Sequence, residues 1–234
     1  MKIGLLGYGK MGQTIAKYAK ERKHEIVYTA DKNMEEGDIE QADVVINFSV
    51  PDAAVFNIKK ALQLNIPVVC GTTGWLDKFE EVIQFCKEKN TAFLYSSNFS
   101  IGVNLFLKLN DLASRLIEPH KQEYKVSMKE IHHVYKLDAP SGTALSLAKP
   151  LISIDYFKEW ELNGTGLEKL NIEAIREREV PGKHIVTFRS DVDEISLKHE
   201  AFNRDGFAQG AIIAAEWLAD KKGIFTMQDV LNNS

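Results

Sequence analysis

Residues 130–144 (EIHHVYKLDAPSGTA) carry the side chains of this chain that are best suited to proton transfer. Two histidines, His132 and His133, are adjacent, and Lys136 follows the first of them by four positions. An imidazole titrates near neutral pH and can act as a general acid or a general base. A lysine ammonium beside it can donate a proton or stabilise negative charge. The run therefore predicts a site at which a small acidic substrate exchanges a proton.

The second half of this run predicts an anion site at the start of a helix. Pro140 keeps the residue before it extended, Ser141 is a natural N-cap, and residues 144–149 (ALSLAK) are typical of a helix. Gly142 has no side chain, so Ser141, Gly142 and Thr143 can direct N–H groups and hydroxyls outward. Backbone N–H groups at a helix N-terminus bind anions such as carboxylates.

A strand end followed by a capped helix would produce part of this pattern without any chemistry. The run as a whole, however, resembles the signature of the 4-hydroxy-tetrahydrodipicolinate reductases, also called dihydrodipicolinate reductases, of the bacterial diaminopimelate and lysine pathway. The resemblance implies NAD(P)H-dependent reduction of the cyclic imine formed from 4-hydroxy-tetrahydrodipicolinate, giving tetrahydrodipicolinate. It implies that His132 and Lys136 are catalytic. The substrate-binding residues that we expect are His133, Ser141, Gly142 and Thr143.

Composition places the chain among ordinary globular proteins and excludes several classes of function. Its 234 residues are 44% hydrophobic and 26% charged, with a net charge of −4, so no basic surface for nucleic acid or anionic membrane is indicated. No apolar run approaches the length of a membrane span, and the N-terminus lacks signal-peptide features. Only two cysteines, Cys70 and Cys86, occur. We therefore expect a cytoplasmic protein without disulfides.

The N-terminal residues predict a dinucleotide site. An apolar strand at residues 2–6 leads into a Gly-x-Gly-x-x-Gly turn and then into a helical pattern. Gly7 permits the tight turn, Gly9 lets a pyrophosphate approach the backbone, and Gly12 allows the helix to pack closely on the strand. The cofactor-binding residues expected here are Gly7, Tyr8, Gly9, Lys10, Met11 and Gly12.

A second strand, residues 25–29, leads to an acid that could choose the cofactor. Asp31 lies about 20 residues past Gly12, where an acidic side chain usually binds the adenosine ribose. A solvated loop acid is the alternative. The neighbouring Lys32 could tolerate a ribose phosphate. We therefore expect NADH as the cofactor, with NADPH also accepted.

Strands and helices alternate from here to residue 95. Apolar strands at 43–48, 67–70 and 91–95, with helices between them, predict a Rossmann-like doubly wound parallel sheet. Loops that follow such strands are where this fold binds ligands. Two of these loops, GTTG at 71–74 and SSNFS at 96–100, resemble the cofactor loops of the same family. The loop residues assigned to the cofactor are Gly71, Thr72, Thr73, Ser96, Ser97, Asn98 and Phe99. Serines replace the family's usual Ala-Ala/Pro, a change that largely backbone contacts would tolerate.

The middle of the chain predicts a second, α+β domain with an open sheet. It begins with an apolar helix at 101–117 and a strand at 124–132, and a hairpin follows at 184–202. Residues 152–173 give no clear pattern and are expected to be loop with short irregular elements. The family resemblance implies that this domain binds the substrate and forms a homotetramer through its sheet; a polar outer face would argue against that assembly.

These patterns predict one domain formed by residues 1–100 and 204–234, and a second domain formed by residues 101–203.

We assign no site role to the run between Arg176 and His184, because Arg178 stands where the family usually has glycine. The other four histidines, His184 among them, are expected to be surface or core residues. No third ligand with suitable spacing accompanies His132 and His133, so no metal is expected.

Two other functions fit parts of the pattern. Another small Rossmann reductase would need a different substrate motif or a catalytic cysteine, and neither Cys70 nor Cys86 is placed like a nucleophile. A cofactor-binding sensor without chemistry would bind the dinucleotide but would have no need of His132 and Lys136.

Overall fold

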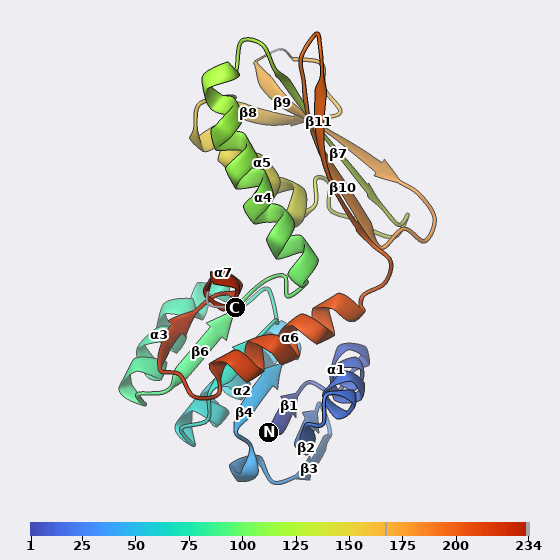
Figure 1. Cartoon of the computed structure of the whole chain (residues 1–234). Coiled ribbons are helices and arrows are strands. Elements are labelled where there is room, and N and C mark those ends of the chain that lie inside the picture. The colour runs from blue at the N-terminus through green and yellow to red at the C-terminus, as the bar shows by residue number, and fades with distance from the viewer. Residues whose placement is uncertain (167, 233–234) are drawn as a thin grey trace. The chain divides into compact units, whose positions relative to one another are not determined.

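The computed structural model describes residues 1–166 and 168–232, which form two units (Figure 1). Unit 1 comprises residues 1–101 and 205–234, and unit 2 comprises residues 102–204. These limits lie one residue from the expected ones, and the last two residues of the expected range 204–234 lie outside the described part. No helix in the described ranges is long and apolar enough to cross a membrane.

Unit 1 is built on a seven-stranded sheet in the order β12-β6-β5-β4-β1-β2-β3. The strands are β1 (Lys2–Leu6), β2 (Glu25–Asp31), β3 (Met34–Gly37), β4 (Val44–Asn47), β5 (Val68–Cys70), β6 (Ala92–Tyr95) and β12 (Gly223–Phe225). All neighbours are parallel except β3, which runs antiparallel to β2. The doubly wound parallel sheet is thus confirmed. The strand β3 (MEEG) was not expected, because its exposed side chains leave no apolar alternation.

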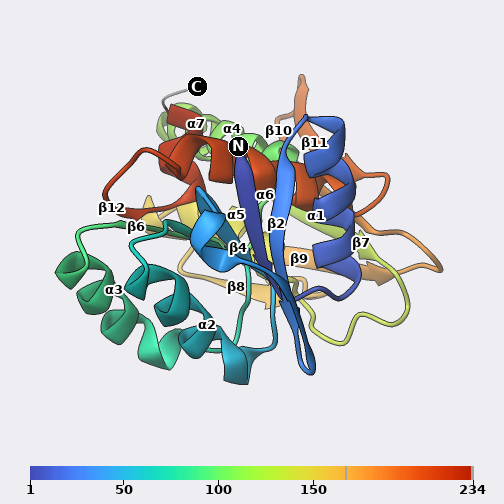
Figure 2. The same ribbon diagram turned by 90° about the horizontal axis from the view of Figure 1, so that it is seen from below.

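Helices cover both faces of this sheet (Figure 2). They are α1 (Lys10–Glu21), α2 (Pro51–Gln63), α3 (Phe79–Glu88), α6 (Asp205–Leu218) and α7 (Met227–Asn232), with short 3-10 helices η1 (Ile39–Gln41) and η2 (Leu76–Lys78). One core lies beneath α1 and α6 and another beneath α2 and α3. Along β1, Ile3 and Leu5 enter the first core and Leu6 the second. In the sheet, β2 lies on one side of β1 and β4 lies on the other, so the strand order reverses at β1. Doubly wound sheets bind ligands at such a switch point.

Unit 2 packs two helices on one face of a five-stranded sheet in the order β11-β10-β7-β9-β8. Its elements are α4 (Ile101–Ile117), η3 (Glu118–His120), β7 (Lys125–His132), α5 (Gly142–Ser153), β8 (Glu159–Leu162), β9 (Lys169–Arg176), β10 (Gly182–Arg189) and β11 (Glu194–Ala201). The helices α4 and α5 share a core with the sheet that includes Phe106, Leu147 and Phe188. The amide of Asn110 donates to the carbonyl of Leu147 at 2.9 Å and joins the two helices.

The expected hairpin is confirmed as β10 and β11, but the expectation of loop over residues 152–173 was wrong. This region contains β8 and the first half of β9. In β9, Leu170 and Ile172 point into the core and alternate with the polar or charged residues Lys169, Asn171 and Glu173, which is a strand pattern. The strand β8 is a short, mostly exposed edge strand with little apolar signal. Because β9 runs parallel to β7, the sheet is mixed.

Candidate active site

The turn between β1 and α1 has the geometry that a dinucleotide needs. Gly7 has a φ of +95°, and a Cβ there would lie 2.2 Å from the carbonyl oxygen of Phe48. A Cβ on Gly12 would lie 2.2 Å from the carbonyl oxygen of Gly7. At Gly9, by contrast, no heavy atom of the described residues lies within 4 Å of the Cβ position. The three glycines therefore do what their spacing predicted: one turns the chain, one leaves an open approach, and one permits close packing.

This open approach faces the start of α1. Gly9 is the N-cap and has no side chain to occupy the N–H groups of the first turn, which begins at Lys10. Free N–H groups at a helix N-terminus suit a pyrophosphate. Asp31 ends β2, the strand beside β1, and its exposed carboxylate accepts a hydrogen bond from the Lys32 N–H at 2.8 Å. The residues present thus fit a dinucleotide.

The two predicted cofactor loops follow β5 and β6, and several of their side chains are used inside the protein. The Thr72 hydroxyl is buried and accepts a hydrogen bond from the Ser49 N–H at 2.9 Å. The ring of Phe99 is 1% exposed and packs against Phe48 at 5.5 Å between ring centroids. The Ser96 hydroxyl donates to the Asn98 carbonyl at 2.8 Å. Thr73 and Ser97 keep exposed side chains, and the rest of what these loops can offer a ligand is mainly backbone.

In unit 2, strand register brings four ionisable side chains to one place. Glu130 and His132 are two apart on β7 and share its buried face. His184 on β10 is paired directly with Glu130, and Arg176 on β9 is paired with His132. All four side chains therefore come from the face that α4 and α5 cover.

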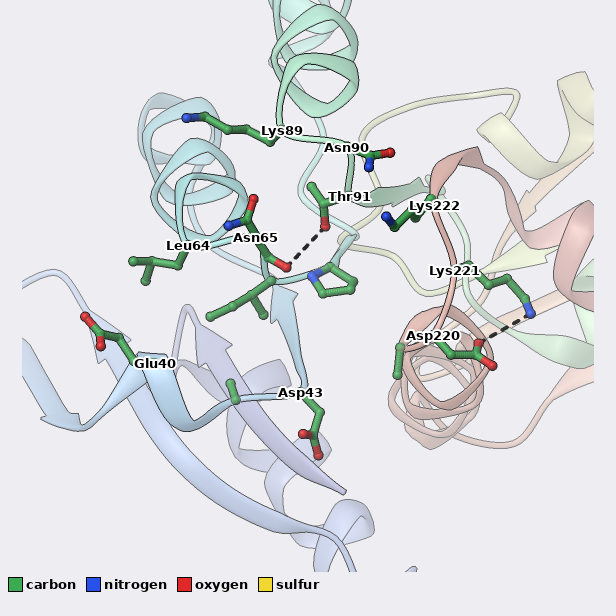
Figure 3. A pocket seen from close by; sticks show the side chains of 14 residues that line it. Glu40, Asp43, Leu64, Asn65, Lys89, Asn90, Thr91, Asp220, Lys221 and Lys222 are labelled. Atoms are coloured by element: carbon green, nitrogen blue, oxygen red, sulfur yellow. Dashed lines mark hydrogen bonds and ion pairs between the residues drawn. The ribbon is translucent and has the colours of Figure 1, made fainter.

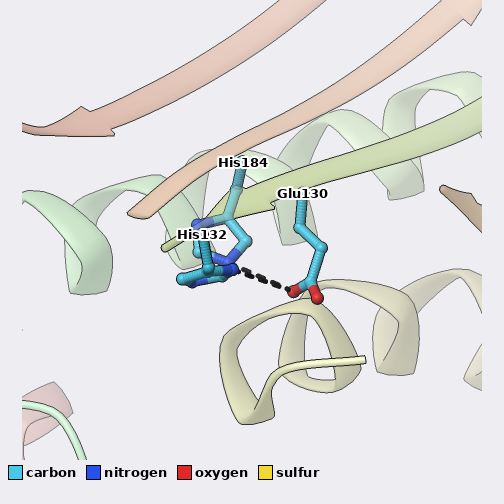
Figure 4. Close-up of side chains that lie close together, drawn as sticks. All are labelled: Glu130, His132 and His184. Atoms are coloured by element: carbon cyan, nitrogen blue, oxygen red, sulfur yellow. Dashed lines mark ion pairs between the residues drawn. The ribbon is translucent and has the colours of Figure 1, made fainter. Parts of the chain in front are cut away.

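The carboxylate of Glu130 is fully buried and lies beside the two imidazoles, with one oxygen directed towards both (Figure 4). One oxygen, Oε1, accepts from both terminal nitrogens of Arg176 at 3.3 Å. The other, Oε2, accepts from the Ser141 N–H at 3.0 Å. It also lies 3.7 Å from Nδ1 of His132 and 3.8 Å from Nε2 of His184. The two rings meet edge to face at 5.0 Å.

Arg176 connects this carboxylate with the loop that carries Lys136. Its Nε donates to the carbonyl of Lys136 at 3.3 Å, and one terminal nitrogen donates to the carbonyl of Asp138 at 2.6 Å. The ammonium of Lys136 donates to both carboxylate oxygens of Asp138 at 2.8 Å. Glu130, Arg176 and the Lys136 loop thus form one connected network.

The structure turns Ser141 away from the outward position that the expected anion cradle gave it. The Ser141 hydroxyl is buried, accepts from the Ala144 N–H at 3.1 Å and contacts Nε2 of His184 at 3.1 Å, while its N–H goes to Glu130. Its polar groups therefore face inward, because the N-cap bond and the buried carboxylate both lie on that side. Gly142 is exposed and Thr143 half-buried, so the outward positions remain with these two.

His133 follows the end of β7 and lies outside the buried cluster. Its Nε2 is 3.3 Å from a guanidinium nitrogen of Arg204, which donates the hydrogen bond. An arginine at this position was not among the expected site residues.

Burial decides the protonation of the two clustered histidines. It lowers the pKa of His132, and the positive charges of Lys136 and Arg176 lower it further against the opposing effect of Glu130. Burial lowers the pKa of His184 to about 3. Both imidazoles are therefore neutral at neutral pH. The hydrogen bonds from Lys136 lower the pKa of the Asp138 carboxyl, which keeps that ion pair charged.

Glu130, His132 and His184 offer one ligand atom each within 4.8 Å of one another, which is compatible with a metal ion. The carboxylate, however, already bonds to the Arg176 guanidinium and to a backbone N–H. A divalent cation would have to enter beside that fixed positive charge. We therefore describe the cluster as a neutralised carboxylate beside two imidazoles.

The sequence patterns had indicated no site role for Glu130, Arg176 or His184. The signal for Glu130 was present, since a strand places residues 130 and 132 on the same face. His184 is buried, as a core histidine would be, yet its ring contacts Ser141. The place of His184 and Arg176 in the site follows only from the pairing of three strands: β10 lies antiparallel to β7, and β9 lies parallel to it.

A hollow of about 570 Å³ lies elsewhere, at the amino-terminal edge of the unit 1 sheet (Figure 3). Residues of both charges line it, including Asp43, Lys89 and Lys222. Doubly wound sheets bind ligands at the opposite, carboxyl edge. We assign this hollow no role in the site.

Sequence models described as "Dihydrodipicolinate reductase, N-terminus" and "Dihydrodipicolinate reductase, C-terminus" match residues 1–99 and 102–231. The chain belongs to this family. A 4-hydroxy-tetrahydrodipicolinate reductase of Christiangramia forsetii is 47% identical over 236 aligned positions, covering 100% of this chain and 98% of the relative. Another from Methanocaldococcus jannaschii is 35% identical and covers 97% and 80%.

A solved dihydrodipicolinate reductase from a Paenisporosarcina species, with dipicolinate bound, has a TM-score of 0.82 over 98% of both chains. Its sequence identity is 21%, so this likeness shows the shared fold. Membership of the dihydrodipicolinate reductase family makes the chain an NAD(P)H-dependent oxidoreductase of diaminopimelate and lysine biosynthesis. The resemblance found in the sequence is thereby confirmed.

Proposed function

We propose that the chain reduces the cyclic imine formed from 4-hydroxy-tetrahydrodipicolinate, with His132 and Lys136 as its proton-transfer residues. The observation that carries this proposal is the coupling of His132, through Glu130, to the start of α5: one carboxylate oxygen accepts from the Ser141 N–H at 3.0 Å and lies 3.7 Å from His132 Nδ1. The proton-transfer group and the expected carboxylate site are therefore neighbours.

The residues divide the work by charge. When bound, reduced nicotinamide supplies the hydride. Because burial keeps His132 neutral, its imidazole accepts or relays a proton, whereas the Lys136 ammonium begins with a proton to give. Gly142 and Thr143, exposed or half-exposed at the start of α5, bind a substrate carboxylate, and His133, held by Arg204, contributes to the same site.

The cofactor proposal is NADH, with NADPH also accepted. It is supported by the exposed Asp31 carboxylate at the end of β2 and by the glycine turn beside it. An acid at this place accepts hydrogen bonds from a free ribose diol and repels a 2′-phosphate.

A coupled assay tests the reaction. Substrate is generated by the preceding synthase, purified protein is added, and loss of reduced-nicotinamide absorbance is followed. Turnover that depends on both the synthase product and this protein is expected. Cofactor binding without turnover would support the sensor alternative and would contradict the proposal.

The carboxylate site is tested with a product-shaped inhibitor. Pyridine-2,6-dicarboxylate should compete with the substrate, and Thr143→Val should weaken both by about 10-fold, because a hydrogen bond to a charged group contributes roughly 1.5–3 kcal/mol. Ser153→Ala, at the other end of α5, is the control, since within residues 1–166 and 168–232 that hydroxyl bonds only to the Pro150 carbonyl. Unchanged inhibition in the Thr143 variant would show that the site is misassigned.

A homotetramer formed through the unit 2 sheet stays a prediction, and the outer face of the sheet argues against it. That face carries ion pairs, such as Lys129 with Glu173 at 2.9 Å and Lys183 with Glu200 at 3.1 Å. Light scattering of the purified protein decides the assembly.

A cytoplasmic location rests on the two free cysteines, both buried, and is tested by fractionation.

A further inference from the structure

Glu130 is a buried acid for which the proposed function gives no role. Its carboxylate is completely buried although no reaction step has been assigned to it. Burying a charge is unfavourable unless the charge is paired and its hydrogen-bonding capacity is used. The partners of Glu130 therefore indicate what the side chain is for.

Arg176 neutralises Glu130 and is itself fully used. A guanidinium has five N–H donors in a planar fork. Those of Arg176 reach Glu130 Oε1 and the carbonyls of Lys136, Asp138 and Ile175. The guanidinium thus fixes one carboxylate oxygen and ties the loop that carries Lys136 to the same point.

The second oxygen, Oε2, faces the histidines. It accepts from the Ser141 N–H, and it has room for one more donor. Nδ1 of His132 lies 3.7 Å away, and this buried nitrogen has no hydrogen-bond partner within the described residues. A shift of the ring by about 0.5–1 Å would bring Nδ1 to hydrogen-bond distance. Such bonds are often long before the reacting complex forms.

The competing imidazole already has another partner. Nε2 of His184 lies 3.1 Å from the Ser141 hydroxyl and 3.8 Å from Glu130. Ser141 therefore satisfies Nε2 of His184, the nitrogen that faces Glu130, and the remaining acceptor capacity of Glu130 is left to His132. On the other side of His132, a Cβ on Gly182 would come within 3.3 Å of Nε2. Glycine leaves that edge of the ring less crowded than any other residue would.

We propose that Glu130 is a positioning residue that holds the proton of His132 on Nδ1 and so presents Nε2 for proton transfer. Through Arg176 and Ser141 the same carboxylate aligns the Lys136 loop and the start of α5. The inference rests on the proposed function of His132, but it concerns a residue to which that function assigns no role.

The test compares Glu130→Gln with Glu173→Gln. Both are glutamates of neighbouring strands paired with a cation, but Glu173 faces outward and pairs with Lys129. Glutamine keeps the shape of Glu130 and loses its charge and one acceptor oxygen. We expect Glu130→Gln to lower kcat by about 10–10³-fold with little change in NADH Kd. Glu173→Gln should leave kcat unchanged, and equal kcat in the two variants would overturn the inference.

A double variant separates positioning from a general structural role. In a His132→Gln background, Glu130→Gln should cost a clearly smaller factor than in the unaltered protein, because the part of its effect that is exerted through the imidazole is already lost. A loss of the same factor in both backgrounds would contradict the inference.

The tautomer can be observed directly in the full chain. Histidine labelled with ¹⁵N gives distinct signals for the two neutral tautomers, and His132→Gln identifies the signal among six histidines. We expect the Nδ1–H form in the unaltered protein and less of it in Glu130→Gln. A wild-type Nε2–H form would overturn the inference even if the variant folded poorly. Absence of turnover in the wild type would refute the proposed function and would leave this measurement to decide the inference.

Discussion

Unit 1 builds its candidate dinucleotide site from backbone, whereas unit 2 builds its candidate catalytic site from buried side chains. In unit 1, Gly7 and Gly12 each have a backbone carbonyl within 2.2 Å of the position of a Cβ. The side chains of Thr72 and Phe99, predicted to serve the cofactor, are used for internal contacts. In unit 2, by contrast, the imidazole that we propose as the proton-transfer group lies in a cluster with a carboxylate, a guanidinium and a serine cap.

This difference indicates which substitutions each site tolerates. A backbone site is insensitive to many side-chain changes but sensitive to any Cβ at its glycines. A site of buried polar side chains is sensitive even to substitutions of equal size, because each group is the hydrogen-bond partner of another. Four predictions use this contrast, beginning with the largest expected effect.

The largest effects should follow from removal of the proton-transfer groups in unit 2. His132→Gln and Lys136→Ala should each lower kcat by about 10²–10⁴-fold, which is what a positioned acid or base contributes. NADH affinity should stay near wild type, since the glycine turn belongs to unit 1. Steady-state kinetics and a fluorescence titration with NADH measure both quantities.

Two exposed residues provide the controls for these variants. His120→Gln and Lys125→Ala make the same chemical changes outside the cluster and should be neutral. The variant lacking both His132 and Lys136 should be less damaged than the product of the single effects, because the two residues act together. Near-normal kcat in both single variants would remove their assignment.

Acid should destabilise unit 2 through His184. Its pKa is about 3 when folded and about 6.5 when unfolded. Between these values the unfolded chain binds the additional proton, so the free energy of unfolding falls as pH decreases from 6.5 towards 4. The cost from His184 at pH 4 is roughly 3 kcal/mol. The pKa of His132 is lowered as well, by burial and by the charges of Lys136 and Arg176, although Glu130 raises it. His132 therefore also makes the folded protein less stable in acid.

Urea unfolding at pH 7, 5.5 and 4 measures this dependence. His184→Gln cannot take up the proton and should show a shallower decline in stability than the wild type. Its stability at pH 7 should be lower, since the contact with the Ser141 hydroxyl changes. Parallel declines in the two proteins would mean that His184 does not carry the acid sensitivity.

The glycine turn of unit 1 can be divided into folding and binding roles. Gly12→Ala should lower both the melting temperature and NADH affinity, because its Cβ meets the Gly7 carbonyl. Gly9→Ala should keep the melting temperature, since its Cβ has open space, and should still raise NADH Kd by about 10-fold or more through contact with the pyrophosphate. Equal NADH binding by Gly9→Ala and the wild type would place the pyrophosphate elsewhere.

The same contrast explains what the sequence could predict. The glycine turn is local: its spacing, the strand before it and the helix after it lie within 21 residues, so both the motif and its geometry were predictable. The helix α4 was likewise predicted with its observed limits, residues 101–117, from its apolar pattern. The run at 130–144 was recognised because its residues are contiguous.

The cluster around Glu130 could not be assembled in this way. Arg176 is 46 residues from Glu130, and it reaches the carboxylate because β9 pairs in parallel with β7. A parallel pairing depends on the crossover that connects the strands, and part of that crossover, β8, has almost no periodic signal. The inward turn of Ser141 also depends on Glu130 and His184, so the cradle was predicted without its buried support.

The smallest expected effect concerns cofactor choice, which one side chain can influence at an otherwise backbone-built site. Asp31 is exposed at the end of β2 and should favour the free ribose of NADH, whereas Lys32 softens the repulsion of a 2′-phosphate. We expect kcat/KM for NADH to equal or exceed that for NADPH, and Asp31→Ser to shift the ratio towards NADPH by up to about 10-fold, or roughly 1.4 kcal/mol. Asp220→Ser removes an equal charge from the opposite edge of the same sheet and should leave the ratio unchanged. A wild-type preference for NADPH of about tenfold or more would contradict the role of Asp31. An equal shift in both variants would instead indicate a general effect of net charge, because only Asp31 adjoins the glycine turn through the pairing of β1 with β2.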